Sequence, residues 1–386
     1  MTESQCDIAI IGGGPVGAAL ALALRDSKLD VRIFEARKAQ HTSTDPRALA
    51  LSYGSRLLLN RMGVWDGLTH VSPINTIHIS QKNHFGRTLL RAAELNVPEL
   101  GYVLPFSTLQ TRLETALQQS NTTCLSGAMV TELRNNTENA TLVYRQGEED
   151  HTLHARLAVV ADGGKLLEAA HPPAIHDYGQ SAVIAHVTCA RPQLATAFER
   201  FTPHGPVALL PYHSGYELIW TVPNTATQSM LQWDDATFLA QLHQHFGDRV
   251  GEFLTVGKRS SFPLRLKRAR DITLPHTVLL GNAAQTLHPV VGQGFNMGLR
   301  DAWELAQEIL DTAPEALGSD VMLLSYRLMR RLDRNAGSRF TDGLVRMFSN
   351  DLPLLKAGRG ISLSVLDCLP GAKNFVARRM MFGANG

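Results

Sequence analysis

The chain has 386 residues, of which 44% are hydrophobic and 19% charged, and its formal net charge at pH 7 is only +2. This length and composition supply enough apolar surface for a large core and predict about two domains. The weak net charge argues against a nucleic-acid-binding surface.

The 4 cysteines and 15 histidines are scattered along the chain. Their spacing fits neither a disulfide framework nor a set of metal ligands, which favours a reducing compartment and no bound metal. No apolar stretch reaches about 18 residues, and no secretory signal segment is recognisable. We therefore expect a cytoplasmic protein without a transmembrane helix.

A strand, a glycine-rich turn and a helix are predicted at the start of the chain. Residues 8–11 form an apolar run, and Gly12, Gly14 and Gly17 follow it with the spacing of a dinucleotide-binding turn. In such a turn the first glycine makes the bend, the second admits a pyrophosphate and the third lets helix and strand pack closely. The pattern predicts that a dinucleotide binds here.

The residues that flank this turn complete the predicted nucleotide site. Pro15 and Val16 open the helix, and residues 31–34 read as the second parallel strand. That strand ends at Glu35, at the distance where a carboxylate accepts the ribose hydroxyls of a bound adenosine, with Ala36 beside it.

The middle of the chain predicts two interleaved domains. Residues 108–117 have a helical pattern, and residues 157–161 form a third apolar strand that ends at Asp162. Strands from about residue 179 to 263 alternate apolar and polar residues, as in an antiparallel sheet covered on one face. The predicted fold class is α/β, with these parts: a Rossmann-like nucleotide-binding domain over 1–75, 99–178 and 264–330, a mainly antiparallel substrate domain over 76–98 and 179–263, and a helical C-terminal region over 331–386.

A second glycine-rich segment, residues 281–298, follows a short apolar strand and leads into a helix expected to begin near Asn296. Pro289 stiffens the turn, while Gly292 and Gly294 let the backbone approach a flat ligand. The N–H groups at the helix start carry partial positive charge, which suits the negative pyrimidine side of a reduced flavin. An ordinary structural turn has the same pattern, but the N-terminal motif favours a flavin.

Three blocks in this order resemble the single-component flavoprotein aromatic hydroxylases typified by para-hydroxybenzoate hydroxylase. The blocks are Gly12-x-Gly14-x-x-Gly17 with Glu35, then Ala161-Asp162-Gly163, then Gly281-Asn282 with Pro289-x-x-Gly292-x-Gly294-x-Asn296. Most members of that family have Asp where this chain has Asn282 and His where it has Gln285. This variant, together with residues 45–51, 61–65 and 257–260, is similar to the ubiquinone-biosynthesis branch.

The resemblance implies FAD as cofactor and NADPH or NADH as a transient co-substrate. In such enzymes the flavin takes electrons from NAD(P)H, forms a hydroperoxide with O₂ and hydroxylates a phenol, while the protein positions the reactants and excludes water. The ubiquinone branch implies a polyprenylated phenol, such as a 2-polyprenyl-6-methoxyphenol, as substrate. The sequence assigns no catalytic base.

The resemblance also places particular residues at the cofactor and the substrate. The residues expected to bind the flavin or the nicotinamide beyond the first motif are Arg47, Gln110, Asp162, Gly281, Asn282, Pro289, Gly292, Gln293, Gly294, Phe295 and Asn296. For Arg47 a surface arginine is the alternative, and for Gln110 a solvated helix face. Tyr212 and Trp220 are expected to line the substrate site, although each residue type also suits a core.

The C-terminal region interleaves apolar residues with basic ones such as Lys373, Arg378 and Arg379. This composition suits either the surface of an anionic membrane or a helix packed on the body. A peripheral position on the inner membrane face, a place in a ubiquinone-biosynthesis complex and a homo-oligomer all remain open. Two other functions share the nucleotide motifs: a flavin-dependent dehydrogenase or oxidase, and a non-catalytic flavin-binding subunit.

Overall fold

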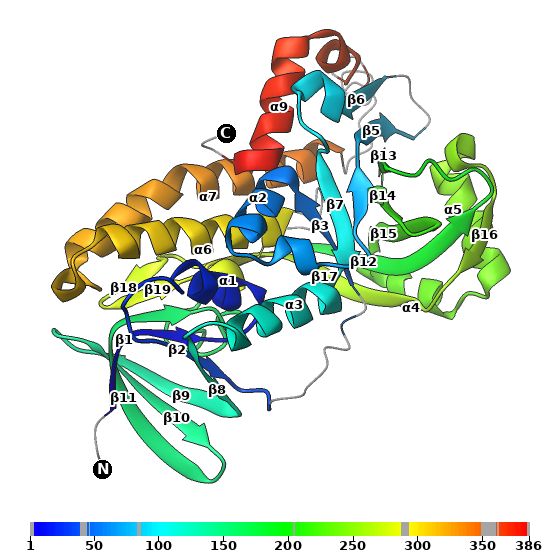
Figure 1. The fold of residues 1–386 in the computed structure, drawn as a ribbon. Coiled ribbons are helices and arrows are strands. Elements are labelled where there is room, and N and C mark those ends of the chain that lie inside the picture. The colour runs from blue at the N-terminus through cyan, green and yellow to red at the C-terminus, as the bar shows by residue number, and fades with distance from the viewer. Residues whose placement is uncertain are drawn as a thin grey trace.

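The computed structural model describes residues 4–38, 45, 47–82, 86–203, 205–286, 293–348, 360 and 363–383, and the side chains of 336–348 lie outside this set. Two large sheets stand side by side, and long helices cover the first of them (Figure 1).

The first sheet is built around the N-terminal strand. β1 (Ser4–Ile11) lies between β2 (Val31–Glu35) and β11 (Glu149–Val160), and all three run parallel. Ile8 and Ile10 are fully buried because a parallel sheet is covered on both faces, which accounts for the continuous apolar run. The other strands of this sheet are β8 (Thr123–Ser126), β9 (Ala128–Asn135), β10 (Ala140–Gln146), β18 (Thr273–Leu274) and β19 (Thr277–Leu279).

Four helices pack with this sheet. α1 (Pro15–Ala23) lies between α3 (Phe106–Gln118) and α6 (Gln293–Asp311), and α7 (Asp320–Phe348) covers α6 (Figure 1). Small and apolar residues of α1 are fully buried in this layer, so the helix that follows the glycine turn is held firmly against its neighbours. The helix expected to begin near Asn296 begins three residues earlier, at Gln293.

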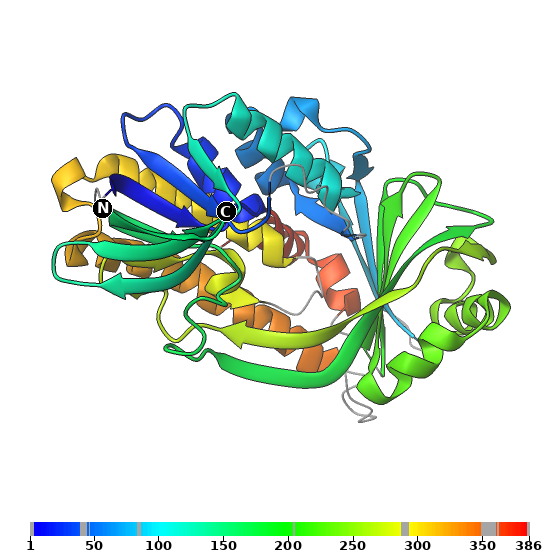
Figure 2. The ribbon, with the colours of Figure 1, turned by 90° about the horizontal axis from the view of Figure 1, so that it is seen from below.

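The second sheet is antiparallel except for one parallel pair, β13 with β5. Its strands are β5 (Thr76–Gln81), β6 (Arg87–Arg91), β12 (Ala174–Cys189), β13 (Thr196–Thr202), β14 (Gly205–Tyr212), β15 (Gly215–Pro223), β16 (Phe253–Val256), β17 (Ser260–Arg268) and β20 (Gln285–Thr286). The long strands β12 and β17 run from beneath the first body into this sheet (Figure 2). They connect the two parts of the molecule directly.

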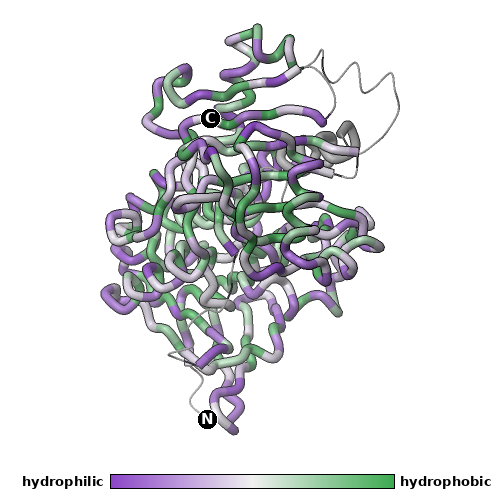
Figure 3. Tube along the Cα trace, turned by 90° about the vertical axis from the view of Figure 1, so that its right-hand side faces the viewer, coloured by the Kyte–Doolittle hydropathy of each residue, from purple (hydrophilic) through white to green (hydrophobic). Residues whose placement is uncertain are grey.

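Smaller elements fill the space between and around the two sheets. They are the three-stranded sheet β3 (Ala48–Ser52), β4 (Ser72–Ile74) and β7 (Gly101–Pro105), the helices α2 (Tyr53–Arg61), α4 (Asn224–Gln232), α5 (Asp235–Phe246) and α9 (Pro370–Phe382), and the short 3-10 helices 65–67, 92–95, 248–250, 281–283 and 314–316. Hydrophobic stretches gather in the body of the molecule, and hydrophilic ones mark its outer turns (Figure 3).

The two faces of the second sheet have different partners because side chains alternate along each strand. Val183, Leu218 and Trp220 point to one face, where α5 closes a separate apolar core. Ala182 and Ile219 point to the other face, toward the nucleotide-binding part. One face of the second sheet is therefore buried in its own core, and the other face lines a site between the domains.

The observed architecture confirms the predicted fold class: a Rossmann-like sheet interleaved with a mainly antiparallel one, followed by a helical C-terminal region. The predicted domain boundaries stay a prediction. Among the described residues, no helix is both long and apolar enough to cross a membrane. Over the same residues, no group of His, Cys, Asp and Glu side chains is arranged to hold a metal ion.

Candidate active site

One cavity of about 740 Å³ joins the glycine-rich loops to the inner face of the second sheet. Its nucleotide end is lined by residues that the sequence placed at the cofactor: Gly14, Pro15, Val16, Arg47, Asp162, Gly281, Asn282, Gln293, Gly294, Phe295 and Asn296. Segments that lie far apart in the chain thus form one wall.

The N-terminal turn shows why three glycines are needed. Gly12 has a φ of +110°, and a Cβ there would lie 2.7 Å from the backbone oxygen of Ala161. A Cβ at Gly17 would lie 2.1 Å from the backbone oxygen of Gly12, so only glycine permits this helix-to-strand contact. At Gly14 a Cβ would meet no atom within 4 Å. The space beside Gly14 is therefore open on the cavity side, where a phosphate group fits.

Glu35 closes the same turn from the second strand. Its carboxylate accepts hydrogen bonds from the backbone N–H of Gly13 at 2.9 Å and from Arg37, whose side chain forms an ion pair with it at 3.0 Å. Burial acts to raise the pKa of Glu35, but the hydrogen bonds from Arg37 outweigh it and hold the pKa below its usual value. The carboxylate is therefore ionised at neutral pH and ready to accept ribose hydroxyls. Ala36 beside it is exposed.

Gln110 and Asp162 fix the loops that surround the cofactor end. Gln110 is buried, and its amide donates to the backbone oxygen of Gly13 at 3.2 Å and to Glu114 at 2.6 Å. This corrects the alternative of a solvated helix face, because the residue lies under the glycine turn. The Asp162 carboxylate accepts the backbone N–H groups of Gly164 at 2.7 Å and Leu166 at 2.9 Å. Both side chains hold backbone in place, and a direct contact of either with the flavin or the nicotinamide stays a prediction.

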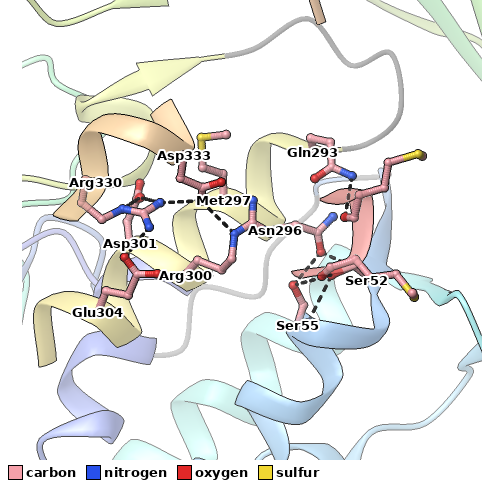
Figure 4. A network of polar contacts seen from close by, with 12 residues as sticks. Ser52, Ser55, Gln293, Asn296, Met297, Arg300, Asp301, Glu304, Arg330 and Asp333 are labelled. Atoms are coloured by element: carbon pink, nitrogen blue, oxygen red, sulfur yellow. Dashed lines mark hydrogen bonds and ion pairs between the residues drawn. The ribbon is translucent and has the colours of Figure 1, made fainter. Parts of the chain in front are cut away.

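Asn296 anchors the start of α6. Its Oδ1 accepts hydrogen bonds from the backbone N–H of Ser52 at 2.8 Å and from the hydroxyl of Ser55 at 2.7 Å, and its Nδ2 donates to the backbone oxygen of Ala50 at 2.9 Å (Figure 4). The side chain is thus bonded to β3 and α2. Gln293 donates to the backbone oxygen of Met380 at 3.1 Å, which connects the same helix start to α9.

A buried ionic cluster on the next turns holds α6 against α7 (Figure 4). Arg330 is fully buried, and its guanidinium contacts Asp301 at 2.5 Å and Asp333 at 2.8 Å as well as Glu304. Arg300 pairs with the same Asp333 at 3.0 Å. The cluster thus joins α6 to α7, and the N-terminal end of α6, with its free N–H groups, borders the cavity.

Arg47 and Asn282 border the cavity with accessible side chains. The Arg47 guanidinium forms an ion pair with Asp45 at 2.5 Å and lies over the rings of Phe106 and Phe262, 5.8 and 5.3 Å from their centroids. Arg47 thus borders the cavity with a side chain that is 49% exposed, and its role at the flavin or the nicotinamide stays a prediction. Asn282 is exposed toward the same space. Pro289 and Gly292, also expected at the flavin, lie outside the described residues.

The far end of the cavity is an apolar chamber between the second sheet and the C-terminal region. Its walls come from four places: β5 and β6 (Ile77, Ile79 and Leu90), β12 to β15 (Ile184, Ala197, Phe201, Ala208, Leu210 and Ile219), β17 (Phe262 and Leu264) and the C-terminal segment (Leu363, Leu366, Val376, Ala377, Met380 and Met381). The chamber suits a long apolar group attached to a ring.

Of the two residues expected to line the substrate site, Trp220 does not line the chamber, whereas Tyr212 lies next to it. Trp220 is buried on the opposite face of β15, with its ring 5.6 Å from that of Phe238 and 5.1 Å from that of His245. It belongs to the α5 core because it follows Ile219, which takes the cavity face. Tyr212 lies on the cavity side of β14 and packs beside Ile74 and Ala197, next to the lining residues.

One polar residue of the chamber was missed by the sequence analysis. Glu199 of β13 lies between Ala197 and Phe201 on the face that lines the cavity. The sequence holds a signal for this residue, because Glu199 stands between Ala197 and Phe201 on one face of the strand. Assigning that face to the cavity needed the pairing of β13 with β5 and β14.

Comparison with known proteins identifies the class to which this fold and site belong. Residues 5–336 match the model of the FAD binding domain family, so the chain belongs to that family. It is a FAD-dependent flavoprotein monooxygenase, which uses NAD(P)H and O₂, and this confirms the predicted cofactor and enzyme class.

Particular relatives narrow the comparison further. The chain is 31% identical to ubiquinone hydroxylase UbiL of Rhodospirillum rubrum, with 98% of this chain and 90% of the relative covered. It is 30% identical to 3-demethoxyubiquinol 3-hydroxylase of Escherichia coli, with 94% and 95% covered. Among solved structures, p-nitrophenol 4-monooxygenase PnpA of Pseudomonas putida DLL-E4 has the same fold, with a TM-score of 0.81, 15% identity and 99% of each chain covered.

The residues present fit FAD. Gly14 and Gly294 both border the cavity, and a Cβ at either would point into open space, so the two loops leave room for a ligand at the backbone. The ionised Glu35 lies at the end of β2, where the ribose is expected, and the start of α6 offers N–H groups to the flavin ring. We propose these residues, with Asp162 and Asn282, as the FAD site.

Proposed function

We propose that this protein hydroxylates a polyprenylated phenol of ubiquinone biosynthesis, such as a 2-polyprenyl-6-methoxyphenol. The observation that carries the proposal is the continuity of one cavity from the glycine loops to an apolar chamber. A ring at the junction would lie beside the flavin, while its apolar tail would occupy the chamber. The names of the two hydroxylase relatives support the pathway.

Each part of the site has a separate task in this reaction. Bound FAD supplies the redox chemistry, taking electrons from NAD(P)H and activating O₂. The start of α6 and Asn282 would hold the pyrimidine and ribityl side of bound FAD, and Arg47 would offer a positive charge near the ring or the nicotinamide. The apolar walls, including Phe262 and Ile219, exclude water from the reacting groups.

In this proposal the chamber binds the prenyl tail of the substrate, so the tail contributes to substrate affinity. Burying each CH₂ of a prenyl chain contributes about 0.8 kcal/mol. The proposal is tested by incubating the FAD-loaded enzyme with NAD(P)H and a series of methoxyphenols whose tails have zero to several prenyl units, followed by mass analysis of products. We expect hydroxylated product and a KM that falls as the tail lengthens. Hydroxylation with a KM independent of the tail would contradict the assignment of the chamber.

We also propose that the C-terminal segment contacts the membrane from which such a substrate comes. α9 packs on the body through Ala377 and Met381, but Phe375 is 60% exposed. Val365 and Leu369, just before α9, are about half exposed as well. These side chains lie outside the chamber wall that Leu366 and Val376 form, so a tail could pass from the lipid into the cavity.

A further inference from the structure

Glu199 brings a carboxylate into the apolar end of the cavity. Its strand neighbours are Ile79 of β5 on one side and Ala208 of β14 on the other, and Ala197 and Phe201 flank it along β13. Its Oε1 is buried and has no hydrogen-bond partner among the described residues. Burying a polar oxygen without a partner is costly, so such an atom in a cavity wall indicates a ligand group that completes it.

The other charged groups around the cavity have partners of their own. Four further charged residues line it: Arg47, Asp162, Glu217 and Arg265. Arg47 pairs with Asp45, Arg265 pairs with Asp177 at 2.9 Å, and Glu217 lies 3.3 Å from the ring of His186. Asp162 accepts backbone N–H groups. None of these contacts includes Glu199.

The strands beside β13 place their titratable groups elsewhere. His78 of β5 stacks against Phe198 on the opposite face, and Arg200 donates to the backbone oxygen of His245 near α5. Tyr212 of β14 contacts the ring of His186. In the part of the chain that the structure describes, no ion pair is formed by Glu199, and its Oε1 has no hydrogen-bond partner.

We propose that Glu199 is a catalytic base that accepts the hydroxyl proton of the phenol. The proposal rests on the proposed function, since it requires a phenolic substrate in this chamber. The O–H bond of the phenol breaks, an O–H bond forms on the Glu199 carboxylate, and the electron pair stays on the phenol oxygen. That pair raises the electron density at the ring carbons that an electrophilic oxygen attacks. No further oxidant or reductant is needed for the transfer.

The protonation behaviour of Glu199 suits this role. Burial raises the pKa of the Glu199 carboxyl to about 7. A base is most effective when its pKa lies near the working pH, because it is then both available and strong enough. We therefore expect the hydroxylation rate to rise with pH around this value.

The first test compares Glu199→Gln with Glu138→Gln, which makes the same change at an exposed turn. FAD-loaded protein is reduced, mixed with O₂ and a prenylated methoxyphenol, and the single-turnover yield and rate are followed between about pH 5 and pH 9. For Glu199→Gln we expect a rate lower by about 100-fold and no inflection near pH 7. Glu138→Gln should behave as the wild type, and Glu199→Asp should retain part of the inflection.

Two outcomes distinguish the possible errors. If Glu199→Gln keeps the wild-type rate and inflection while the wild type hydroxylates the phenol, Glu199 is not the base. If the wild type itself makes no hydroxylated phenol with any tail, the proposed function is wrong and this proposal is lost with it.

A second measurement tests the raised pKa of the Glu199 carboxyl through protein stability, without an activity assay. A folded-state pKa above the unfolded one means that folding is favoured while Glu199 is protonated, and that this advantage is lost as pH rises from about 4 to about 7. Replacing the carboxyl by an amide removes the loss. The thermal midpoint of Glu199→Gln minus that of the wild type should therefore be larger at pH 8 than at pH 5. An equal difference at both values would show that the carboxyl is not buried and unpaired.

Discussion

At the scale of single residues, the glycines of the first turn separate packing from binding. Gly17 has no room for a side chain because the backbone of Gly12 is too close, whereas Gly14 has open space before it. The two positions thus serve different purposes although they belong to one motif. Gly17 is required for packing of the fold, whereas Gly14 leaves space for the ligand.

This difference gives a prediction for Gly14→Ala. Its backbone is extended, with a φ of −65°, so alanine is tolerated and we expect the unfolding free energy of the apoprotein to change by less than about 1 kcal/mol. The new methyl group occupies the space where the pyrophosphate is expected, and crowding of about 1–3 kcal/mol would weaken FAD binding by about 5- to 150-fold. Fluorescence titration with FAD measures this.

The matched control is Gly371→Ala at the exposed start of α9, where a Cβ likewise meets nothing within 4 Å. Its FAD affinity should equal that of the wild type. Unchanged affinity in Gly14→Ala would show that the pyrophosphate does not lie against this glycine.

The sequence predicted the role of a residue where that role depends on its neighbours in the chain. Gly12, Gly14, Gly17 and Glu35 could be assigned because turn, strand and helix follow one another within one stretch of chain. Trp220 could not, because the face that a strand turns to a cavity is set by its partners in the sheet. Glu199 was missed for the same reason, and its strand, TAFERFT, does not alternate regularly between apolar and polar residues.

At the scale of the elements, a buried ion cluster joins α7 to α6, the helix whose N-terminal end borders the cavity. Arg330 is fully buried, and it neutralises Asp301 and Asp333 from the neighbouring turns. Sequence patterns predicted a helix near Asn296 and a helical C-terminal region, but they gave no sign that charges would be buried between α6 and α7. Long-range pairing of this kind needs the packed structure.

We predict that Arg330→Ala lowers the unfolding free energy by about 3–5 kcal/mol, because buried Asp301 loses its cation while Asp333 keeps only Arg300. Urea unfolding followed by circular dichroism measures the change, with Arg327→Ala on the exposed side of α7 as control. FAD binding should weaken as well, since the cluster orients α6. A loss of less than about 1 kcal/mol would show that the carboxylates find other partners.

At the scale of the whole molecule, the C-terminal segment has two faces with separate roles. Its inner face closes the chamber, and its outer face carries Phe375, with Arg379 stacked on the ring 5.2 Å from its centroid. Lys373 faces inward and pairs with Glu94 at 2.7 Å, so it adds no free charge to the outer face. Removing the whole segment would open the chamber, and point variants are therefore the cleaner test of membrane contact.

We predict that Phe375→Ser binds anionic vesicles at least about tenfold more weakly than the wild type, because an apolar side chain that enters lipid contributes about 1.5–3 kcal/mol. Co-sedimentation with phosphatidylglycerol-containing vesicles measures this. Leu324→Ser, at an exposed site on α7, is the control and should bind as the wild type does. Equal binding by all three proteins would contradict membrane contact through α9.

The proposed function requires that the enzyme insert one atom of O₂ into a phenol bound in this cavity. The most direct measurement supplies a prenylated methoxyphenol, FAD and NAD(P)H with isotopically labelled O₂ and determines the label in the product by mass spectrometry. We predict one labelled oxygen atom in each molecule of product. An oxidised product without label would instead indicate a dehydrogenase or oxidase, and no flavin reduction by either nicotinamide, with or without the phenol, would indicate a non-catalytic flavin-binding subunit.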